Sequence, residues 1–197
     1  MSVFFCACFR VINMNEFFLA SNRSAFKDEI EIRQVMMKDF DQWSEFAEPI
    51  RIMFNNNFSD EVFVNVFEKL KFQVIMVASL VTNVSDLDPK LLENEGELLE
   101  LFKNLVEVNQ AYFNQENNNI NDTKDKYTWF DSFQFLISKG HRHLDILNYS
   151  FGAFKEYLKA AHRNERNTLL SMGNSLRVAY HADKNGYNKY IDSMNKG

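Results

Sequence analysis

The strongest helical pattern in the chain begins in the stretch Asp145-Ile146-Leu147-Asn148-Tyr149-Ser150-Phe151-Gly152-Ala153-Phe154-Lys155-Glu156-Tyr157-Leu158-Lys159-Ala160-Ala161. Its apolar residues recur at steps of three and four, which is the period of one helix face: Phe151, Phe154, Tyr157, Leu158 and Ala161. A basic run over 163–182 continues the pattern. The spacing predicts a long amphipathic helix over about 150–181, then Gly186 as a left-handed cap and a short helix over 187–194.

Composition sets the fold class. The chain has 197 residues, of which 46% are hydrophobic and 25% charged, which is ordinary for one globular domain with or without a helical appendage. Only six Gly and two Pro are present, which disfavours folds rich in β-turns. Twenty Phe predict a core rich in aromatic rings.

Weaker patterns precede the long helix. The segments 15–20 and 29–35 are predicted to be two short strands, the second because apolar and polar residues alternate in it, and turn residues at 21–24 join them in a β-hairpin. Apolar spacing predicts helices over 39–55 (bent or broken by Pro49), 60–81, 97–113 and 127–137, the last ended by Lys139-Gly140. The expected fold is therefore mainly α: a small helical domain with a short N-terminal β-hairpin and a long C-terminal amphipathic helix.

The same patterns divide the chain into four segments. Residues 1–13 are a short apolar lead, either disordered or the product of a start assigned too early, because Met14 opens a cleaner pattern. Residues 14–116 form the hairpin and helical body, 117–126 a polar linker, and 127–197 the C-terminal helical region. No apolar run reaches the roughly 18–20 residues of a membrane span, so we expect no membrane partner.

Charge is distributed unevenly along the chain. Residues 1–138 carry 12 basic and 22 acidic side chains, whereas 139–197 carry 10 basic and 5 acidic ones. A basic tail on an acidic body suits an acidic partner, a nucleic acid or the body itself. The excess is small for nucleic-acid binding, which we do not expect.

Candidate chemistry is sparse. Cys6 and Cys8 are too close in sequence to pair readily, and two thiolates do not complete a zinc site, so a reducing compartment is expected. His141-Arg142-His143 fits an exposed polar turn at a helix entry better than a metal site. His162 and His181, with Asp145 and Asp183 near them in sequence, lack a recognisable nucleophile. No glycine-rich phosphate loop is present. The sequence predicts no catalytic, cofactor or metal site, and no enzyme.

Two roles remain open for the long helix. Its apolar face can pack on the core of its own domain, or it can mediate assembly with itself or with another helical chain. Core packing is the favoured role, and both can apply to different parts of the helix. The basic residues of the helix lie on other faces than the apolar one: Lys155, Lys159, Arg163 and Arg166.

Three segments, in order, resemble the motifs of one known protein family. The family's short strand and following helix are matched by Ile32-Arg33-Gln34-Val35, Asp39-Phe40-Asp41-Gln42-Trp43 and Ala47-Glu48-Pro49-Ile50. Its Glu-Val-Asn-x-x-aromatic-Phe helix end is similar to Leu105-Val106-Glu107-Val108-Asn109-Gln110-Ala111-Tyr112-Phe113. The Asp-x-Leu-x-Tyr-Ser-hydrophobic-x-x-Phe pattern starting at Asp145 leads into Ala160-Ala161-His162-Arg163-Asn164-Glu165 and Arg177-Val178-Ala179.

Together these segments, which span most of 30–195, resemble the phage tail-assembly chaperones encoded before the tape-measure protein. The resemblance implies a non-catalytic protein of tail morphogenesis acting in the cytoplasm of the bacterial host. Its implied partners are the long, apolar, helical tape-measure protein and the tail tube subunits, and self-association stays open. The predicted partner-binding residues are Phe151, Phe154, Tyr157 and Leu158, with Arg163 and Arg166 at the rim. The alternatives are a structural tail or connector component of the virion and, less favoured, a small helical DNA-binding regulator.

Overall fold

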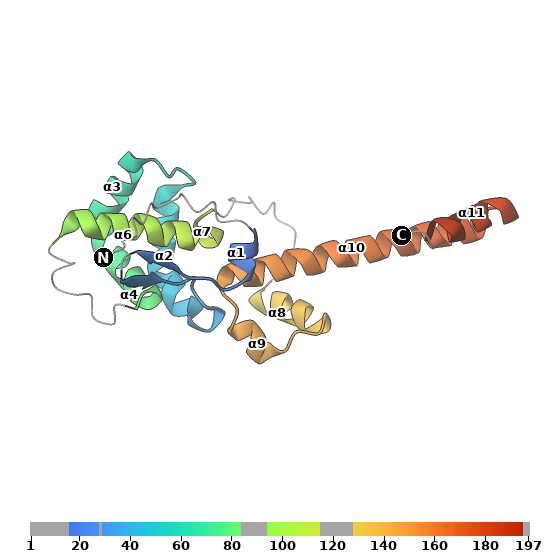
Figure 1. Cartoon of the computed structure of the whole chain (residues 1–197), viewed down its shortest axis with the longest axis horizontal. Coiled ribbons are helices and arrows are strands. Elements are labelled where there is room, and N and C mark those ends of the chain that lie inside the picture. Colours follow the sequence, from blue (N-terminus) through green and yellow to red (C-terminus); the bar gives the residue numbers. More distant parts are fainter. Residues whose placement is uncertain (1–15, 28, 84–93, 115–127, 195–197) are drawn as a thin grey trace, which may run out of the picture. The chain divides into compact units, whose positions relative to one another are not determined.

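The computed structural model describes residues 16–27, 29–83, 94–114 and 128–194. The chain divides into two compact units, residues 1–157 and residues 158–197. The described elements are α1 (Glu16–Ala20), β1 (Ala25–Lys27), β2 (Ile30–Ile32), the 3-10 turn η1 (Met37–Asp39), α2 (Phe40–Phe54), α3 (Asp60–Lys69), α4 (Lys71–Val81), α6 (Glu95–Val108), α7 (Gln110–Phe113), α8 (Trp129–Ser138), α9 (His143–Leu147), α10 (Phe151–His181) and α11 (Lys184–Met194) (Figure 1). The predicted class is confirmed: the fold is mainly helical, with a short hairpin near its start and a long C-terminal helix.

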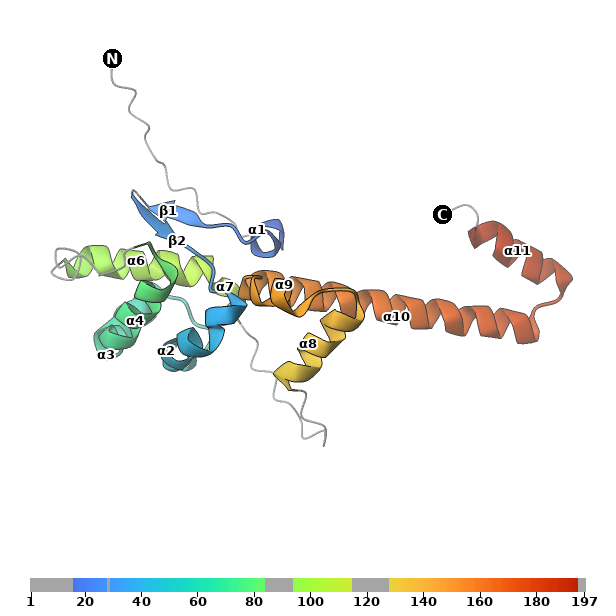
Figure 2. The same cartoon turned by 90° about the horizontal axis from the view of Figure 1, so that it is seen from below.

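The hairpin is shorter than the sequence predicted, and its first strand lies elsewhere. Strands β1 and β2 pair antiparallel with Ala25 opposite Ile32, beside α6 (Figure 2). The predicted strand over 15–20 was wrong, because its described part is helix α1. Three adjacent apolar residues, 17–19, lack the alternation of a half-buried strand.

Helix α2 follows its predicted pattern. It buries Trp43, Ala47, Ile50 and Phe54 on one face. Pro49, expected to bend or break the helix, lies inside it without ending it. The helix ends where the asparagines begin, at Asn55, whose φ of 46° is in the left-handed region that asparagine tolerates.

Two predicted long helices are each divided. The expected helix over 60–81 is interrupted at Leu70, where φ is −122°, and the one over 97–113 at Asn109, where φ is −101°. At Asn109 the cause is tertiary. Its Oδ1 accepts a 2.8 Å hydrogen bond from the backbone N–H of Val35, and its Nδ2 donates to the carbonyl oxygens of Arg33 and Leu105.

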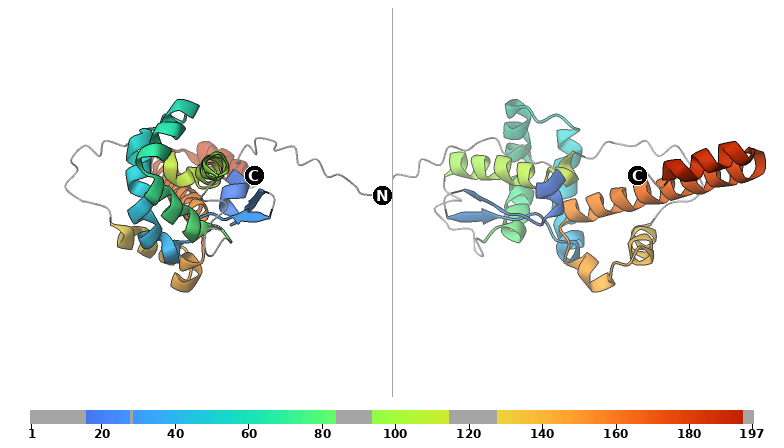
Figure 3. Two further views of the ribbon diagram at one scale, coloured as in Figure 1. Left: turned by 90° about the vertical axis from the view of Figure 1, so that its left-hand side faces the viewer. Right: turned by 45° about the vertical axis from the view of Figure 1, so that its right-hand side comes forward.

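The core of the first unit is aromatic, as the phenylalanine content predicted. Helices α2, α3, α4 and α6 form one bundle (Figure 3). The largest fully buried rings of the first unit come from α2, α6, α7 and α10: Trp43, Phe54, Phe102, Phe113 and Phe154. Edge-to-face pairs join several of them, such as Trp43 and Phe113 with ring centroids 5.8 Å apart.

The chain between the bundle and α10 begins with α8. A reciprocal capping box starts this helix, in which the Thr128 hydroxyl accepts from the Asp131 N–H and the Asp131 carboxylate accepts from the Thr128 N–H. Gly140, with φ of 97°, follows the helix end, as predicted. The predicted lead 1–13 and linker 117–126 lie outside the described residues, and the helices flanking that linker, α7 and α8, belong to the same unit.

The second unit contains most of α10 together with α11. A 2.8 Å hydrogen bond joins the hydroxyls of Ser175 and Tyr190. The predicted left-handed cap at Gly186 was wrong, because this residue lies inside α11. Asp183 Oδ1 accepts from the Gly186 N–H at 2.8 Å, which satisfies an amide in the first turn of α11. None of the helices in the described ranges has both the length and the apolarity to cross a bilayer.

Candidate partner-binding surfaces

The histidine-rich segment before α9 is engaged in local structure. His141 Nδ1 lies 2.9 Å from the hydroxyl of Tyr149, and Arg142 forms a bidentate ion pair with Asp145. His143 is exposed in the first position of α9. Within the described ranges, no three His, Cys, Asp or Glu side chains gather as a metal site requires. Cys6 and Cys8 lie outside those ranges.

Two of the residues predicted to bind a partner belong to the core instead. Phe151 is 4% exposed and Phe154 is 2% exposed. The ring of Phe151 stacks on Phe40 with centroids 4.7 Å apart, and Phe154 contacts the rings of Trp129 and Phe133. Burial leaves no ring face for a partner, so the core-packing role applies to the first turn of α10 and we remove both residues from the candidate surface.

The other four predicted residues keep some access to solvent. The ring of Tyr157 is partly exposed and lies 4.9 Å from Tyr149, measured between ring centroids. Leu158 is half-buried, whereas Arg163 and Arg166 are exposed. These residues stay candidates for the edge of a binding surface.

An exposed apolar row lies farther along α10 than the sequence analysis placed it. Its members, which we call the α10 stripe, are Leu169, Met172, Leu176 and Tyr180. Each is between 59% and 81% exposed. Steps of three and four residues put them on one face of the helix. The signal was present in the sequence, but the polar run 162–168 separates it from the pattern that begins at Phe151.

Basic side chains border the α10 stripe. Arg166 and Arg177 are eleven residues apart, which is about three helical turns, so they share one side of α10. Both are exposed, and neither forms an ion pair with any residue in the described part of the chain. Helix α11 contacts α10 through Ser175 and leaves the stripe uncovered.

A second candidate surface lies in the first unit, between α2 and α8. Two cavities of about 460 Å³ and 480 Å³ share Phe40, Asp41, Ser44 and Trp129 as lining residues. We call them together the α2–α8 groove. Most of its other lining side chains are apolar or aromatic: Met37, Tyr112, Phe133 and Leu147. The sequence did not predict this groove, because Phe40 and Trp129 come together only in the folded chain.

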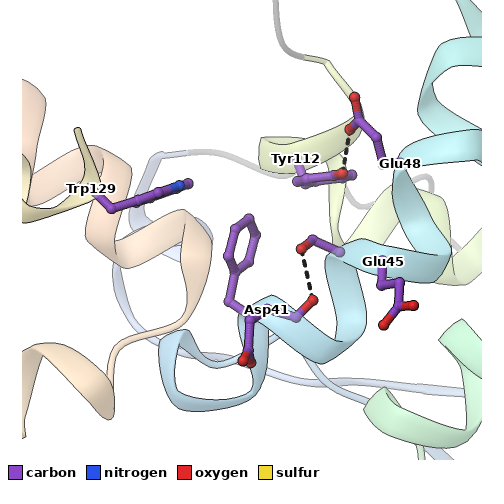
Figure 4. A pocket seen from close by; sticks show the side chains of 7 residues that line it. Asp41, Glu45, Glu48, Tyr112 and Trp129 are labelled. Atoms are coloured by element: carbon purple, nitrogen blue, oxygen red, sulfur yellow. Dashed lines mark hydrogen bonds between the residues drawn. The ribbon is translucent and has the colours of Figure 1, made fainter. Parts of the chain in front are cut away.

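Three carboxylates of α2 lie at the edge of the groove. Asp41, Glu45 and Glu48 recur at steps of four and three residues and therefore share one face of the helix. Figure 4 shows Trp129 and Tyr112 on opposite sides of the groove and the hydroxyl of Tyr112 directed at Glu48. Of the side chains that line the two cavities, one is positively charged, that of Lys38.

The three carboxylates differ in their partners. Glu48 accepts hydrogen bonds from the Arg51 guanidinium at 2.6 and 2.8 Å, and these bonds lower the pKa of Glu48. Burial, followed by the neighbouring Glu48 carboxylate, raises the pKa of Tyr112, so its phenol stays a neutral donor. Asp41 and Glu45 have no cationic partner in the described part of the chain. The groove can therefore take an apolar segment that carries positive charge.

The two surfaces have opposite charge. The α10 stripe is apolar with a basic border, and the α2–α8 groove is apolar and aromatic with an acidic border. Both have the chemistry of protein–protein contacts, in which apolar anchors are framed by polar groups. Comparison with protein families, with curated proteins and with solved structures finds no match to this chain.

Proposed function

We propose that this protein is a non-catalytic phage tail-assembly chaperone that binds the tape-measure protein and the tail tube subunits. The observation that carries the proposal is the α10 stripe, four large apolar side chains in a row that are each more than half exposed. Isolated exposed apolar residues are ordinary on protein surfaces, whereas a continuous row of them marks an interaction site. The three motifs that resemble the chaperone family support the same assignment.

The chemistry of the implied client suits the stripe. A tape-measure protein is a long apolar helical chain that would aggregate before tube subunits coat it. Apolar residues at steps of three and four pack against a second helix with the same spacing. Burying one such side chain contributes about 1.5–3 kcal/mol, and association and side-chain ordering offset much of the sum. A complex of moderate affinity, which a chaperone must release, fits these magnitudes.

The second unit has the properties of a surface that is completed by its partner. Of residues 158–194, none is buried. Tertiary packing of an apolar face supplies most of the stability of helices in proteins, and here that face has no covering element within the unit. A helical client would provide the missing contacts.

The test is co-expression with the tape-measure protein encoded next to this one. The stripe variant carries Leu169→Asp and Leu176→Asp. Its matched control carries Asn167→Asp and Asn174→Asp, which are exposed residues of the same helix with the same seven-residue separation. We expect the wild-type and control proteins to co-purify with soluble tape-measure protein, and the stripe variant to recover at least about tenfold less, since each tenfold step corresponds to about 1.4 kcal/mol.

The possible results separate the claims. A folded wild-type protein that neither binds the tape-measure protein nor keeps it soluble would overturn the chaperone assignment. Detection of the chain in purified particles would then favour a structural virion component. Equal recovery with the stripe and control variants would retain the chaperone and reject the stripe as its binding surface.

A further inference from the structure

We propose that the α2–α8 groove of one copy binds the α10 stripe of a second copy, so that the protein self-associates. The inference goes beyond the proposed function because it involves this chain alone. It rests on two surfaces that were described separately, each within its own unit. Together they form a pair of complementary contacts.

Charge is the first argument. Residues 158–181 contain Lys159, Arg163, Arg166 and Arg177 against the single acid Glu165, a net charge of +3. The groove is lined by three carboxylates and one cation, Lys38, and of the carboxylates Glu48 is already paired with Arg51. Asp41 and Glu45 remain for cations from outside. Opposite charges around an apolar contact favour encounter and select its register.

Chemistry and size are the second argument. The groove walls are rings and aliphatic side chains, and the stripe offers leucine, methionine and tyrosine. Methionine contacts aromatic rings favourably, and the edge of a tyrosine ring packs against another ring. Each cavity has a volume of about 460 or 480 Å³, which is within the range of about 300–1,000 Å³ of pockets that hold small molecules and leaves room for individual side chains of the stripe.

The third argument concerns the direct alternative, in which two α10 stripes pair with one another. An antiparallel pair of identical helices places the same side of each helix together. In a pair centred between Arg166 and Arg177, Arg166 of one copy lies opposite Arg177 of the other, and like charges there weaken the contact. Insertion of the stripe into the acidic groove avoids this repulsion.

Sedimentation of the full-length protein over a wide concentration range tests the inference. The groove variant carries Asp41→Lys and Glu45→Lys, and the arginine variant carries Arg166→Glu and Arg177→Glu. We expect the wild type to self-associate and each variant to do so at least about tenfold more weakly, because charge reversal makes the contact repulsive. Glu61→Lys with Glu68→Lys is the control, since both residues are exposed on α3 away from the groove, and it should associate as wild type does.

Mixing the two charge-reversed variants is the decisive step. The unchanged groove of one variant then meets the unchanged stripe of the other, and the two reversed surfaces also become complementary. The affinity of association in the mixture should return to within about threefold of the wild-type value, because both pairings again join opposite charges. If circular dichroism shows that the groove variant has lost helix, Asp41→Asn with Glu45→Gln replaces it and should weaken association in the same direction.

Three results would overturn the inference. One is a wild-type protein that remains monomeric at every concentration. Another is association that Leu176→Asp abolishes but the groove variant leaves unchanged, which would indicate pairing between stripes. The third is a mixture in which association does not return. No client is present in these measurements, so none of the results bears on whether the protein binds the tape-measure protein.

Discussion

The phenol of Tyr112 donates a 2.7 Å hydrogen bond to Oε2 of Glu48 and thereby links α7 to α2 at the edge of the groove. The same carboxylate accepts two hydrogen bonds from Arg51. Three donors around one carboxylate favour its ionised form, which explains why the pKa of Glu48 is lowered.

This arrangement predicts a specific dependence of stability on pH. A lowered folded-state pKa means that Glu48 stabilises the fold above its unfolded-state pKa and that this contribution is lost as pH falls through the folded-state pKa. Glu48→Gln should cost about 1 kcal/mol at neutral pH, since the group is partly exposed, and should flatten the acid limb of stability. Urea unfolding from neutral to acid pH measures both, with the exposed Glu68→Gln as the control. An unchanged acid limb in Glu48→Gln would contradict the prediction.

The backbone at Gly152 lies close to the side chain of Gln34 and to Leu19. A Cβ on this residue would lie 2.5 Å from Oε1 of Gln34 and 3.3 Å from the backbone oxygen of Leu19. Gln34 is buried and hydrogen-bonded to Ser150 and Phe18, so it cannot move freely. Gly152→Ala should destabilise the first unit by about 1–3 kcal/mol in urea unfolding.

The matched control is Gly173→Ala in the same helix. No neighbouring atom lies within 4 Å of its added Cβ, so the substitution should raise helix stability by about 0.5–1 kcal/mol. Thermal unfolding followed by circular dichroism measures this gain. The two substitutions should therefore have opposite signs, and a shared sign would show that the close contact at Gly152 is relieved by a small shift.

Replacement of the Asn109 side chain should lower the stability of the fold substantially. Its side chain accepts from the N–H of Val35 and donates to two carbonyl oxygens, and all three groups belong to the backbone. Asn109→Ala leaves the Val35 amide without this acceptor, and a buried unpaired polar group costs about 1–3 kcal/mol. Asn104→Ala, at a half-buried position of α6 where the side chain donates to the carbonyl oxygen of Glu100 in the same helix, should be much closer to neutral. Equal unfolding midpoints in the two variants would refute the prediction.

The second unit should show weak amide protection. Its described residues include none that is buried, whereas α2 and α6 bury several side chains each. Local opening requires little free energy where apolar contacts are few. Hydrogen exchange measured at low protein concentration should be faster over 158–194 than over α2. Protection there equal to that of α2 would mean that an unrecognised contact covers the second unit.

The sequence predicted the elements whose stability comes from their own apolar pattern. The buried face of α2 and the long helix α10 are of this kind, and both have a clear helical period. The breaks at Leu70 and Asn109 were missed. At Asn109, hydrogen bonds to distant segments outweigh the local helical preference.

The candidate surfaces were less predictable than the helices. Periodicity places a residue on a face but does not say whether that face is covered, so Phe151 and Phe154 were assigned to a partner although they contact Phe40 and Trp129. The α10 stripe has the same spacing and is uncovered. The groove depends on residues from α2, α7 and α8, which no local pattern connects.

Helix α10 starts in one unit and ends in the other. Nucleation is the slow, costly step of helix formation, with an equilibrium penalty of about 10⁻³, whereas each added residue of a growing helix changes the free energy little. The buried turn from Phe151 to Phe154 supplies that nucleus as part of the core. The remainder of α10 therefore needs only propagation from a turn that is already formed, so the exposed stripe is held in helical form without a nucleation cost of its own.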